Sequence, residues 1–472
     1  MNYTINNAPL TWRHFLITGI ASLGQLIGTG LATLVSVIIP LYQLTAHPEL
    51  SSIMQGLVGS MNLIGIMVGG SVIGNLSDKY GNLFLFRFCP VLICVSAIIS
   101  LLFPHLAVLM ICLFMMGFGI GGEYSLDSNY ISELMPDRWR FIMVGSAKAC
   151  CALGNIIVAG VSFLIIRNWT DADLWPRLMW IMIFISGLMI LLRIRFWESP
   201  KWLLEQGKYQ QAETDVHHFL GNDVNVAMPG NKTDPQIEEN KENNPSDLTS
   251  KIGNIDKKDS SESISMWQFL KGNFKKVIFT GVPWACEGLG VYGIGVFLPI
   301  LVMALGIEHV SPGESPIKHV ASSVEVTLWI SCIILPGFVL GLCMINKMRG
   351  GLMQVLGFIF SAISLLILLL AYNNHWPTWI SVVSFMCFEL FLNFGPHLMT
   401  YVLPAKVYPV EVRGQGTGVA TSIGKVGAVL GVFFIPILLK SGGSSLVLIV
   451  SIIVMLIGGL ITWIFNPDRK TI

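Results

Sequence analysis

Ionisable side chains inside long apolar segments are the residues of this sequence best placed to do chemistry. Glu123 and Asp127 stand four residues apart, so on a helix they share one face. Lys148 and Lys425 each interrupt another apolar run. A charge inside a bilayer costs at least about 2.5 kcal/mol, so it usually marks a solute pathway, a proton relay or a buried partner. Ammonium groups attract anions, and buried carboxylates can bind and release protons.

A second polar group lies in the C-terminal half. Glu389, Asn393 and His397 follow one another at intervals of four residues and therefore share a helical face. Glu287 is a further acid within an apolar run. Each of these residues has an alternative structural role, because Glu389 and His397 can be satisfied inside a packed bundle without touching a solute.

The elements that carry these residues are predicted to be transmembrane helices. The chain has 472 residues, of which 53% are hydrophobic and 12% charged, whereas soluble domains carry about 25% charged residues. Apolar runs long enough to cross a bilayer of about 30 Å occur twelve times, as six, a polar gap and six more. The predicted spans are 13–41, 54–76, 85–103, 105–133, 141–166, 175–196, 275–304, 321–345, 350–371, 376–403, 413–439 and 444–465.

The two halves are related by a shift of 273 residues. This shift superposes Gly122 on Gly395, Pro136 on Pro409, Arg140 on Arg413, Gly145 on Gly418 and Gly154 on Gly427. Lys425 falls on position 152, one helical turn from Lys148. The sequence therefore predicts an all-α fold of two repeated six-helix bundles, 1–203 and 274–472, with both ammonium groups facing a cavity between them.

The residues between the bundles, 204–273, are rich in polar side chains and are predicted to form a largely disordered linker. Basic residues are concentrated in one alternating set of connections, which predicts cytoplasmic termini and a cytoplasmic linker. This set contains Lys79, Arg87, Arg138, Arg140, Lys347, Arg349, Arg413, Arg469 and Lys470. We expect a monomer in a bacterial inner membrane, and we read residues 13–41 as a retained first helix.

Two short motifs carry a family resemblance. Gly74-Asn75-Leu76-Ser77-Asp78-Lys79-Tyr80-Gly81 resembles the signature that joins the second and third helices of the major facilitator superfamily, and Glu198-Ser199-Pro200-Lys201-Trp202-Leu203 is similar to a sugar-porter signature. The resemblance implies a gating role for Asp78, Arg140 and Arg413. Lys406 is a departure, because relatives usually carry a glutamate there.

A narrower resemblance to proton:phosphate symporters appears in 393–397, in 424–428 and in Gly121-Gly122-Glu123-Tyr124. It implies that Trp284 and Tyr292 contact the solute. The sequence departs from that pattern at Gly288, where the symporters have an aspartate, with Glu287 one position earlier. It also lacks their first-helix acids in 25–30 and has Cys151 in place of their phosphate-binding glutamine.

These observations predict a secondary transporter that works by alternating access, without an enzymatic activity, a cofactor, a metal or a nucleic-acid partner. No phosphate-binding loop for ATP is present in the sequence. We expect a small anionic or zwitterionic solute, such as phosphate or an organic acid, bound by Tyr124, Lys148, Trp284, Tyr292, Asn393, His397 and Lys425. The predicted proton-coupling groups are Glu123, Asp127, Glu287 and Glu389.

Three alternatives remain at this point. Four intramembrane acids against two lysines also suit export of a cationic or amphipathic compound, and the sugar-porter signature suits a sugar or polyol. A receptor that moves no solute is a third possibility, although the linker shows no folded signalling module. Because an unpaired buried ammonium is costly, we also expect Lys148 to pair with Glu123 or Asp127, and Lys425 with Glu287 or Glu389.

Overall fold

The computed structural model describes residues 3–4, 7–45, 50–169, 172–220, 224–225, 266–307, 314–408 and 413–467. The side chains of Asp78 and Arg413, two of the predicted gating residues, lie outside the described part of the chain.

The N-terminal half is a bundle of long apolar helices. In chain order these are α1 (Trp12–Ala21), α2 (Leu23–Thr45), α3 (Ser52–Tyr80), α4 (Asn82–Leu102), α5 (Leu106–Leu134), α6 (Asp137–Asn168), the 3₁₀ helix η2 (Ala172–Leu178) and α7 (Met179–Arg193). The helices α1 and α2 together form the first predicted span, which has a break at Ser22.

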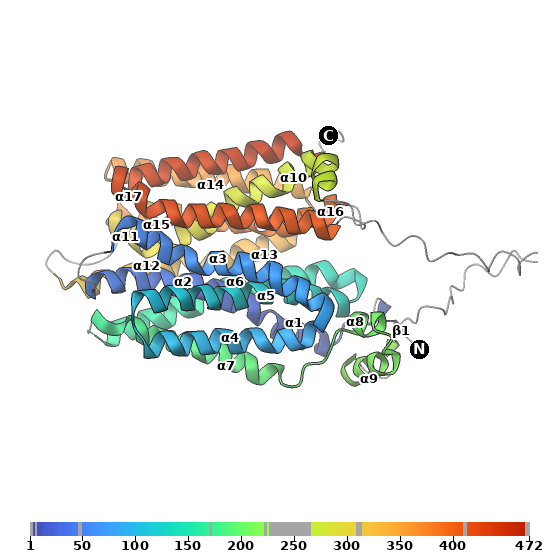
Figure 1. The fold of residues 1–472 in the computed structure, drawn as a ribbon. Helices are drawn as coiled ribbons and strands as arrows, with labels where there is room; N and C mark the ends of the chain where they lie inside the picture. The colour runs from blue at the N-terminus through green and yellow to red at the C-terminus, as the bar shows by residue number, and fades with distance from the viewer. Residues whose placement is uncertain are drawn as a thin grey trace, which may run out of the picture.

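The C-terminal half repeats this pattern. Its helices are α10 (Met266–Gly288), the π-helix η3 (Leu289–Ile294), α11 (Leu298–Ala304), α12 (Pro316–Cys332), α13 (Ile334–Met344), α14 (Gly350–Asn373), α15 (Thr378–Phe394), α16 (Pro396–Val407) and α17 (Arg413–Phe465). A straight helix of 53 residues would be about 80 Å long. Instead α17 doubles back at Gly443, whose φ of 65° is accessible to glycine at little cost, and its two arms lie side by side (Figure 1).

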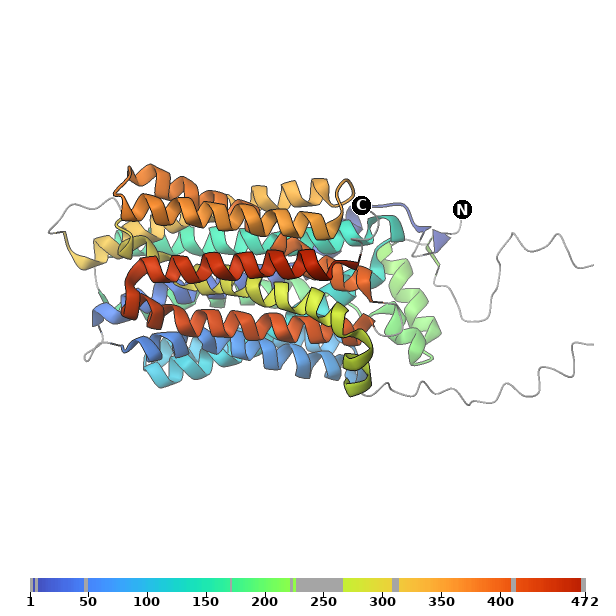
Figure 2. The same ribbon diagram turned by 90° about the horizontal axis from the view of Figure 1, so that it is seen from above.

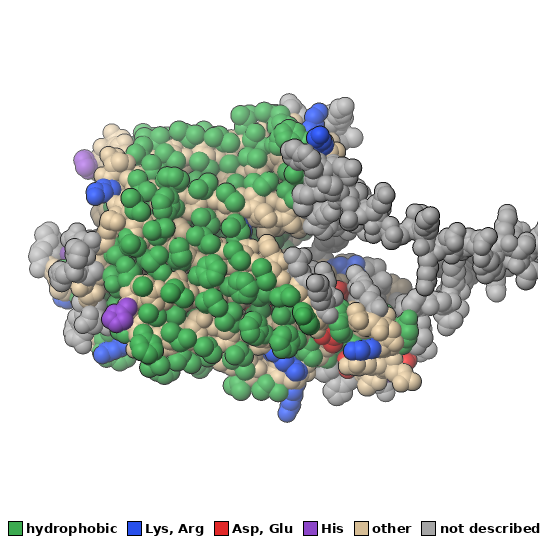
Figure 3. Space-filling view, in the orientation of Figure 1, with side chains coloured by type: hydrophobic (Ala, Val, Ile, Leu, Met, Phe, Trp, Pro, Cys, Tyr) green, Lys and Arg blue, Asp and Glu red, His purple; other side chains and the backbone are tan. Residues whose placement is uncertain are grey.

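The described residues contain eleven helical segments long and apolar enough to cross a membrane. Because the last of these segments holds both arms of α17, the number agrees with the twelve predicted spans. Side chains on the outer face of the helices are predominantly hydrophobic, and charged side chains gather at the ends (Figure 3). An apolar exterior of this kind suits contact with lipid rather than water.

The two bundles lie against one another along their length, with α4 and α7 of the first half at the lower edge of Figure 1 and α10, α14 and α17 of the second half at the upper edge. Both described ends of the chain lie at one end of the molecule, here called the terminal end, and the opposite end is called the far end (Figure 2). Contacts between the bundles join α3 to α17 and join α6 to α12 and α13, while α2 contacts α11 and α12.

Equivalent glycines serve equivalent contacts in the two halves. A Cβ at Gly154 on α6 would collide with the Leu26 carbonyl on α2, and a Cβ at Gly427 on α17 would collide with the Ala285 backbone on α10. Small residues let membrane helices approach this closely. The positions related by the 273-residue shift therefore do the same structural work, as expected of a repeat.

The described part of the predicted linker is structured rather than disordered. Helices α8 (Pro200–Glu205) and α9 (Tyr209–Leu220) follow the first bundle, and strand β2 (Val224–Asn225) pairs in parallel with β1 (Tyr3–Thr4). The apolar side of α9 explains the difference, because Ala212 and Val216 are buried. Residues 226–265 lie outside the described residues, so the disorder predicted for them stays a prediction.

Candidate functional site

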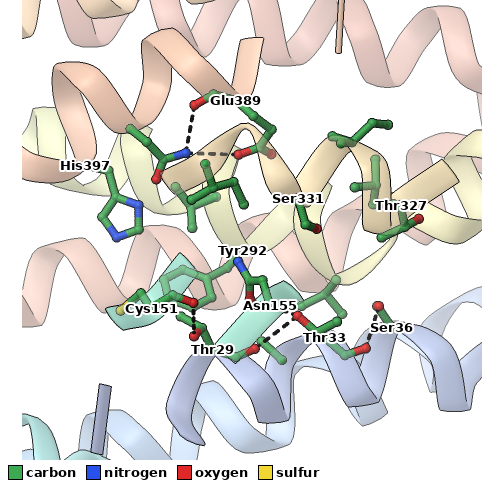
Figure 4. A pocket seen from close by; sticks show the side chains of 18 of the residues that line it. Thr29, Thr33, Ser36, Cys151, Asn155, Tyr292, Thr327, Ser331, Glu389 and His397 are labelled. Carbon is green, nitrogen blue, oxygen red and sulfur yellow. Dashed lines mark hydrogen bonds between the residues drawn. The ribbon is translucent and has the colours of Figure 1, made fainter. Parts of the chain in front are cut away.

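A polar cavity lies between the two bundles. On the N-terminal side its wall is formed by α2 and α6, which contribute Thr29, Thr33, Ser36, Cys151 and Asn155. These side chains hold one another, since the Thr33 hydroxyl lies 2.9 Å from Asn155 Oδ1 and the Thr29 hydroxyl donates to the Cys151 carbonyl at 2.7 Å (Figure 4). The wall presents hydroxyl and amide groups and no formal charge.

The opposite wall comes from the C-terminal bundle. Tyr292, Asn393 and His397 line it together with Glu389, Thr327 and Ser331. Figure 4 labels all of these except Asn393. The Asn393 amide donates to the Glu389 carboxylate at 3.1 Å, as their spacing on one helical face predicts. Three of the predicted solute-binding residues and one of the predicted proton-coupling residues therefore line one cavity.

Interruptions of the helices place these residues. Tyr292 lies in the π-helix η3, within the segment predicted as one span, 275–304. The predicted span 376–403 breaks at Gly395, and His397 lies in the first turn of α16 directly after this break. Broken helices at the midplane are typical of transporter binding sites, because irregular backbone is tolerated only where it borders a cavity or protein.

Lys148 and Lys425 are not among the residues that line the cavity, and each is buried, with only 5% of its surface exposed. Lys425 donates to the Tyr292 hydroxyl at 3.2 Å. Lys148 donates to the Tyr401 hydroxyl at 3.1 Å and to Gln25 Oε1 at 3.4 Å. The two ammonium groups approach the ring of Tyr124, at 5.3 Å for Lys148 and 5.4 Å for Lys425. Ammonium groups from both bundles thus converge on one tyrosine.

The expected lysine–carboxylate pairs are wrong. Within the described residues neither ammonium forms an ion pair, because its partners are the hydroxyl and amide oxygens above. Glu287 instead has an oxygen 3.7 Å from Nδ1 of His397.

Arg193, which the sequence reading did not single out, takes the role expected of Lys148. Its guanidinium binds Glu123 at 2.6 and 2.7 Å and lies 3.7 Å from Asp127, and all three side chains are almost fully buried. The guanidinium also lies 3.7 Å from the centre of the Phe86 ring. Arg193 is near the end of the predicted span 175–196, where a basic residue more often extends to the membrane interface. Its position a little inside that end was the one sign in the sequence that its side chain is buried.

The remaining predicted residues lie elsewhere. Trp284 is buried outside the cavity lining and packs edge-on against Tyr401, with ring centres 4.8 Å apart. Arg140 lies in the first turn of α6, and Arg413 begins α17. The described part of the chain contains no cluster of residues suited to hold a metal ion.

The chain is similar to known transporters over nearly its whole length. It is 24% identical to the inner membrane metabolite transport protein YgcS of Escherichia coli, covering 91% of this chain and 86% of that protein. It is 24% identical to a putative inorganic phosphate transporter 1-13 of rice (82% and 76% covered). It is 25% identical to the glucose transporter GlcP of Staphylococcus epidermidis (89% and 87% covered).

The fold also has solved counterparts. A partially occluded inward open structure of the xylose transporter XylE from E. coli superposes with a TM-score of 0.76, at 18% identity and over 97% of this chain and 98% of XylE. The matched proteins are transporters rather than enzymes, as the sequence predicted. The sequence profile of the sugar (and other) transporter family matches residues 10–472. The chain therefore belongs to this family of the major facilitator superfamily, and it is an integral membrane protein that carries out secondary transport.

Proposed function

We propose that this protein moves a small organic anion or inorganic phosphate across the membrane by alternating access, coupled to protons. The observation that carries the proposal is the pair of buried ammonium groups, Lys148 and Lys425, which donate hydrogen bonds to neutral oxygens in the described structure. A hydrogen bond between a charged and a neutral group is weaker than an ion pair in the same low-dielectric surroundings. An incoming anion is therefore a better partner for either ammonium than the tyrosine that now holds it.

The cavity lining favours an organic acid that also carries hydroxyl groups. Thr29, Thr33, Ser36, Thr327 and Ser331 offer donors and acceptors on both bundles. Hydroxyl lining fixes the orientation of polar solutes by matched hydrogen bonds. A carboxylate directed towards the lysines and hydroxyl groups directed towards this lining would use both features.

The same lining supports a second candidate, a neutral sugar or polyol, and relatives of this chain are named for glucose and for phosphate.

A cationic solute is less well supported than the sequence suggested. Arg193 adds a third buried cation to Lys148 and Lys425, which reduces the formal excess of the four predicted acids from two charges to one. That cation is held inside the N-terminal bundle.

Proton coupling is assigned to the carboxylates around these cations. Glu123 and Asp127 share the single guanidinium of Arg193, so one negative charge there is not balanced. A proton on Asp127 would neutralise it. Glu287 beside His397 is the corresponding group in the C-terminal bundle.

We further propose a monomer in a bacterial inner membrane with cytoplasmic termini.

Solute flux in proteoliposomes tests the proposal. We expect uptake of one member of a labelled panel of anions, comprising inorganic phosphate, lactate and gluconate, and stimulation by an inwardly directed proton gradient. Uptake of xylose or glucose with no anion transported would favour the second candidate. Uptake of a quaternary ammonium compound alone would exclude the anion proposal.

A further inference from the structure

A second cavity opens at the terminal end of the C-terminal bundle, and it shares no lining residue with the central cavity. Three cationic residues border it: Lys276 of α10, Arg349 before α14, and Lys406 of α16. Asn466, which follows α17, completes one side. No acidic residue is present among its described lining residues. We call this cavity the basic groove.

The N-terminal bundle shows what occupies the equivalent place in the other repeat. There the carboxylate of Glu198 accepts hydrogen bonds from the backbone N–H groups that open α4, at 2.8 Å from Asn82 and 3.1 Å from Leu83. The side chain is 8% exposed. A second acid, Glu133, accepts from the hydroxyl of Ser199 in the same network. The start of this helix is therefore capped by a carboxylate of the protein itself.

Both acids are absent from the corresponding positions of the C-terminal bundle. The helix α14 begins 268 residues after α4, and the same shift carries Glu198 to Asn466. Asn466 does lie against the start of α14, since a Cβ added to Gly351 would meet its side chain at 2.5 Å. The 273-residue shift carries Glu133 to Lys406. An amide and an ammonium thus stand where the first repeat has two carboxylates.

We propose that the basic groove binds a phosphate group, which supplies the negative charge that Glu198 supplies in the first repeat. Lys276 and Lys406 would provide charge-assisted hydrogen bonds to its oxygens. The N-terminus of α14 adds backbone N–H groups and the positive end of a 24-residue helix. The phosphate belongs either to a soluble phosphate compound or to the head group of an anionic phospholipid, since both present the same anionic group to lysine and arginine side chains.

The test is the thermal unfolding midpoint of the full-length protein in two arms. In neutral detergent at low salt, pyrophosphate is titrated as the soluble probe. In nanodiscs of phosphatidylcholine, phosphatidylglycerol is added as the lipid probe. We expect at least one probe to raise the unfolding midpoint. The variant Lys406→Glu restores the acid of the first repeat and should raise the apparent Kd for that probe by at least about tenfold. Lys406→Gln should give an intermediate loss.

Matched variants separate this site from other effects. Lys440→Glu makes the same charge change at an exposed lysine of α17 near the far end and should respond as the wild type does. Lys425→Ala in the central cavity should also leave the response intact, which keeps this inference separate from the proposed transport function. A rise with pyrophosphate identifies a soluble ligand, and a rise with phosphatidylglycerol alone identifies a lipid. Equal responses of Lys406→Glu and wild type, or no response of the wild type to either probe, would overturn the proposal.

Discussion

At the scale of single residues, the surroundings of Lys148 carry most of the functional argument. A desolvated ammonium needs partners, and Lys148 finds them in Gln25 and Tyr401, one from each bundle. Its nitrogen also lies 4.2 Å from the centre of the Tyr401 ring, a cation–π contact across the bundle interface. The lysine is therefore held by groups that separate when the bundles move apart.

This geometry predicts graded effects at the Lys148–Tyr401 contact. Lys148→Ala should lower the affinity for the transported anion strongly, whereas Tyr401→Phe, which removes only the hydroxyl, should change it by less than about tenfold. Neutralising Glu123 or Asp127 should not rescue Lys148→Ala, because neither acid is its partner. Binding measured by isothermal titration or by competition would check this, and rescue by Asp127→Asn would contradict it.

A second residue-scale prediction concerns stability. Removing one member of a buried ion pair costs about 3–5 kcal/mol, because the other charge remains desolvated. Arg193→Met should therefore lower the thermal midpoint markedly, since it strands both Glu123 and Asp127. The double variant Arg193→Met/Glu123→Gln should recover part of the loss. A double variant no more stable than Arg193→Met would show that Glu123 is not the partner that matters.

Proton coupling is tested at Asp127. Asp127→Asn fixes a neutral side chain beside Arg193, so accumulation driven by a proton gradient should be lost while exchange of labelled for unlabelled solute continues. Glu314→Gln, at an exposed acid paired with Lys318 near the far end, is the control and should retain both activities. Gradient-driven accumulation by Asp127→Asn at the wild-type rate would remove Asp127 from the proton path.

The sequence identified candidate functional residues more readily than it identified the contacts that those residues make. Spacing of four residues placed Glu389 beside Asn393, because that contact lies within one helix. The partners of Lys148 and Lys425 lie on other helices, and helical periodicity does not specify which helices cross near them. From the sequence we therefore expected each lysine to pair with a buried acid. In the structure both lysines instead donate hydrogen bonds to hydroxyl and amide oxygens.

At the scale of helices, hydropathy predicted the spans but not their interruptions. The spans 275–304 and 376–403 read as continuous apolar runs, yet the π-helix η3 and the break at Gly395 place Tyr292 and His397 at the cavity. Such breaks depend on neighbouring helices that re-satisfy the freed backbone groups. Local composition offers only weak signals for them, here a glycine-rich stretch near Tyr292 and the Gly395-Pro396 pair.

The contact between α3 and α17 gives an element-scale prediction. A Cβ at Gly56 would collide with the backbone carbonyl of Phe433, which cannot move aside as a side chain can. Gly56→Leu should therefore hold the far end apart and reduce uptake by at least about tenfold, while overpacking costs about 1–3 kcal/mol of stability. Gly187→Leu on α7, where the space around the glycine is open, is the matched control. The prediction assumes that the bundles close at the far end through this contact during transport. Equal uptake rates for the two variants would contradict it.

At the scale of the whole molecule, the internal repeat was the most informative feature of the sequence. It predicted two bundles, and Gly154 and Gly427 confirm it by making equivalent contacts. It did not predict that the repeats differ in charge at the terminal end, where Glu198 faces α4 and Asn466 faces α14. The two halves therefore share a pseudo-symmetric backbone but differ in charge at the terminal end, which allows them to differ in function.

The central claim is that the protein selects an anion because it holds buried ammonium groups from both bundles. The most direct measurement is uptake of the transported anion by proteoliposomes containing Lys425→Ala, with folded protein verified by its elution profile and thermal midpoint. Lys425 holds Tyr292 at the cavity wall, and loss of a buried charged partner costs about 2–5 kcal/mol, or at least about thirtyfold in affinity. The account predicts that uptake is abolished in folded protein, and an affinity equal to that of the wild type would contradict it.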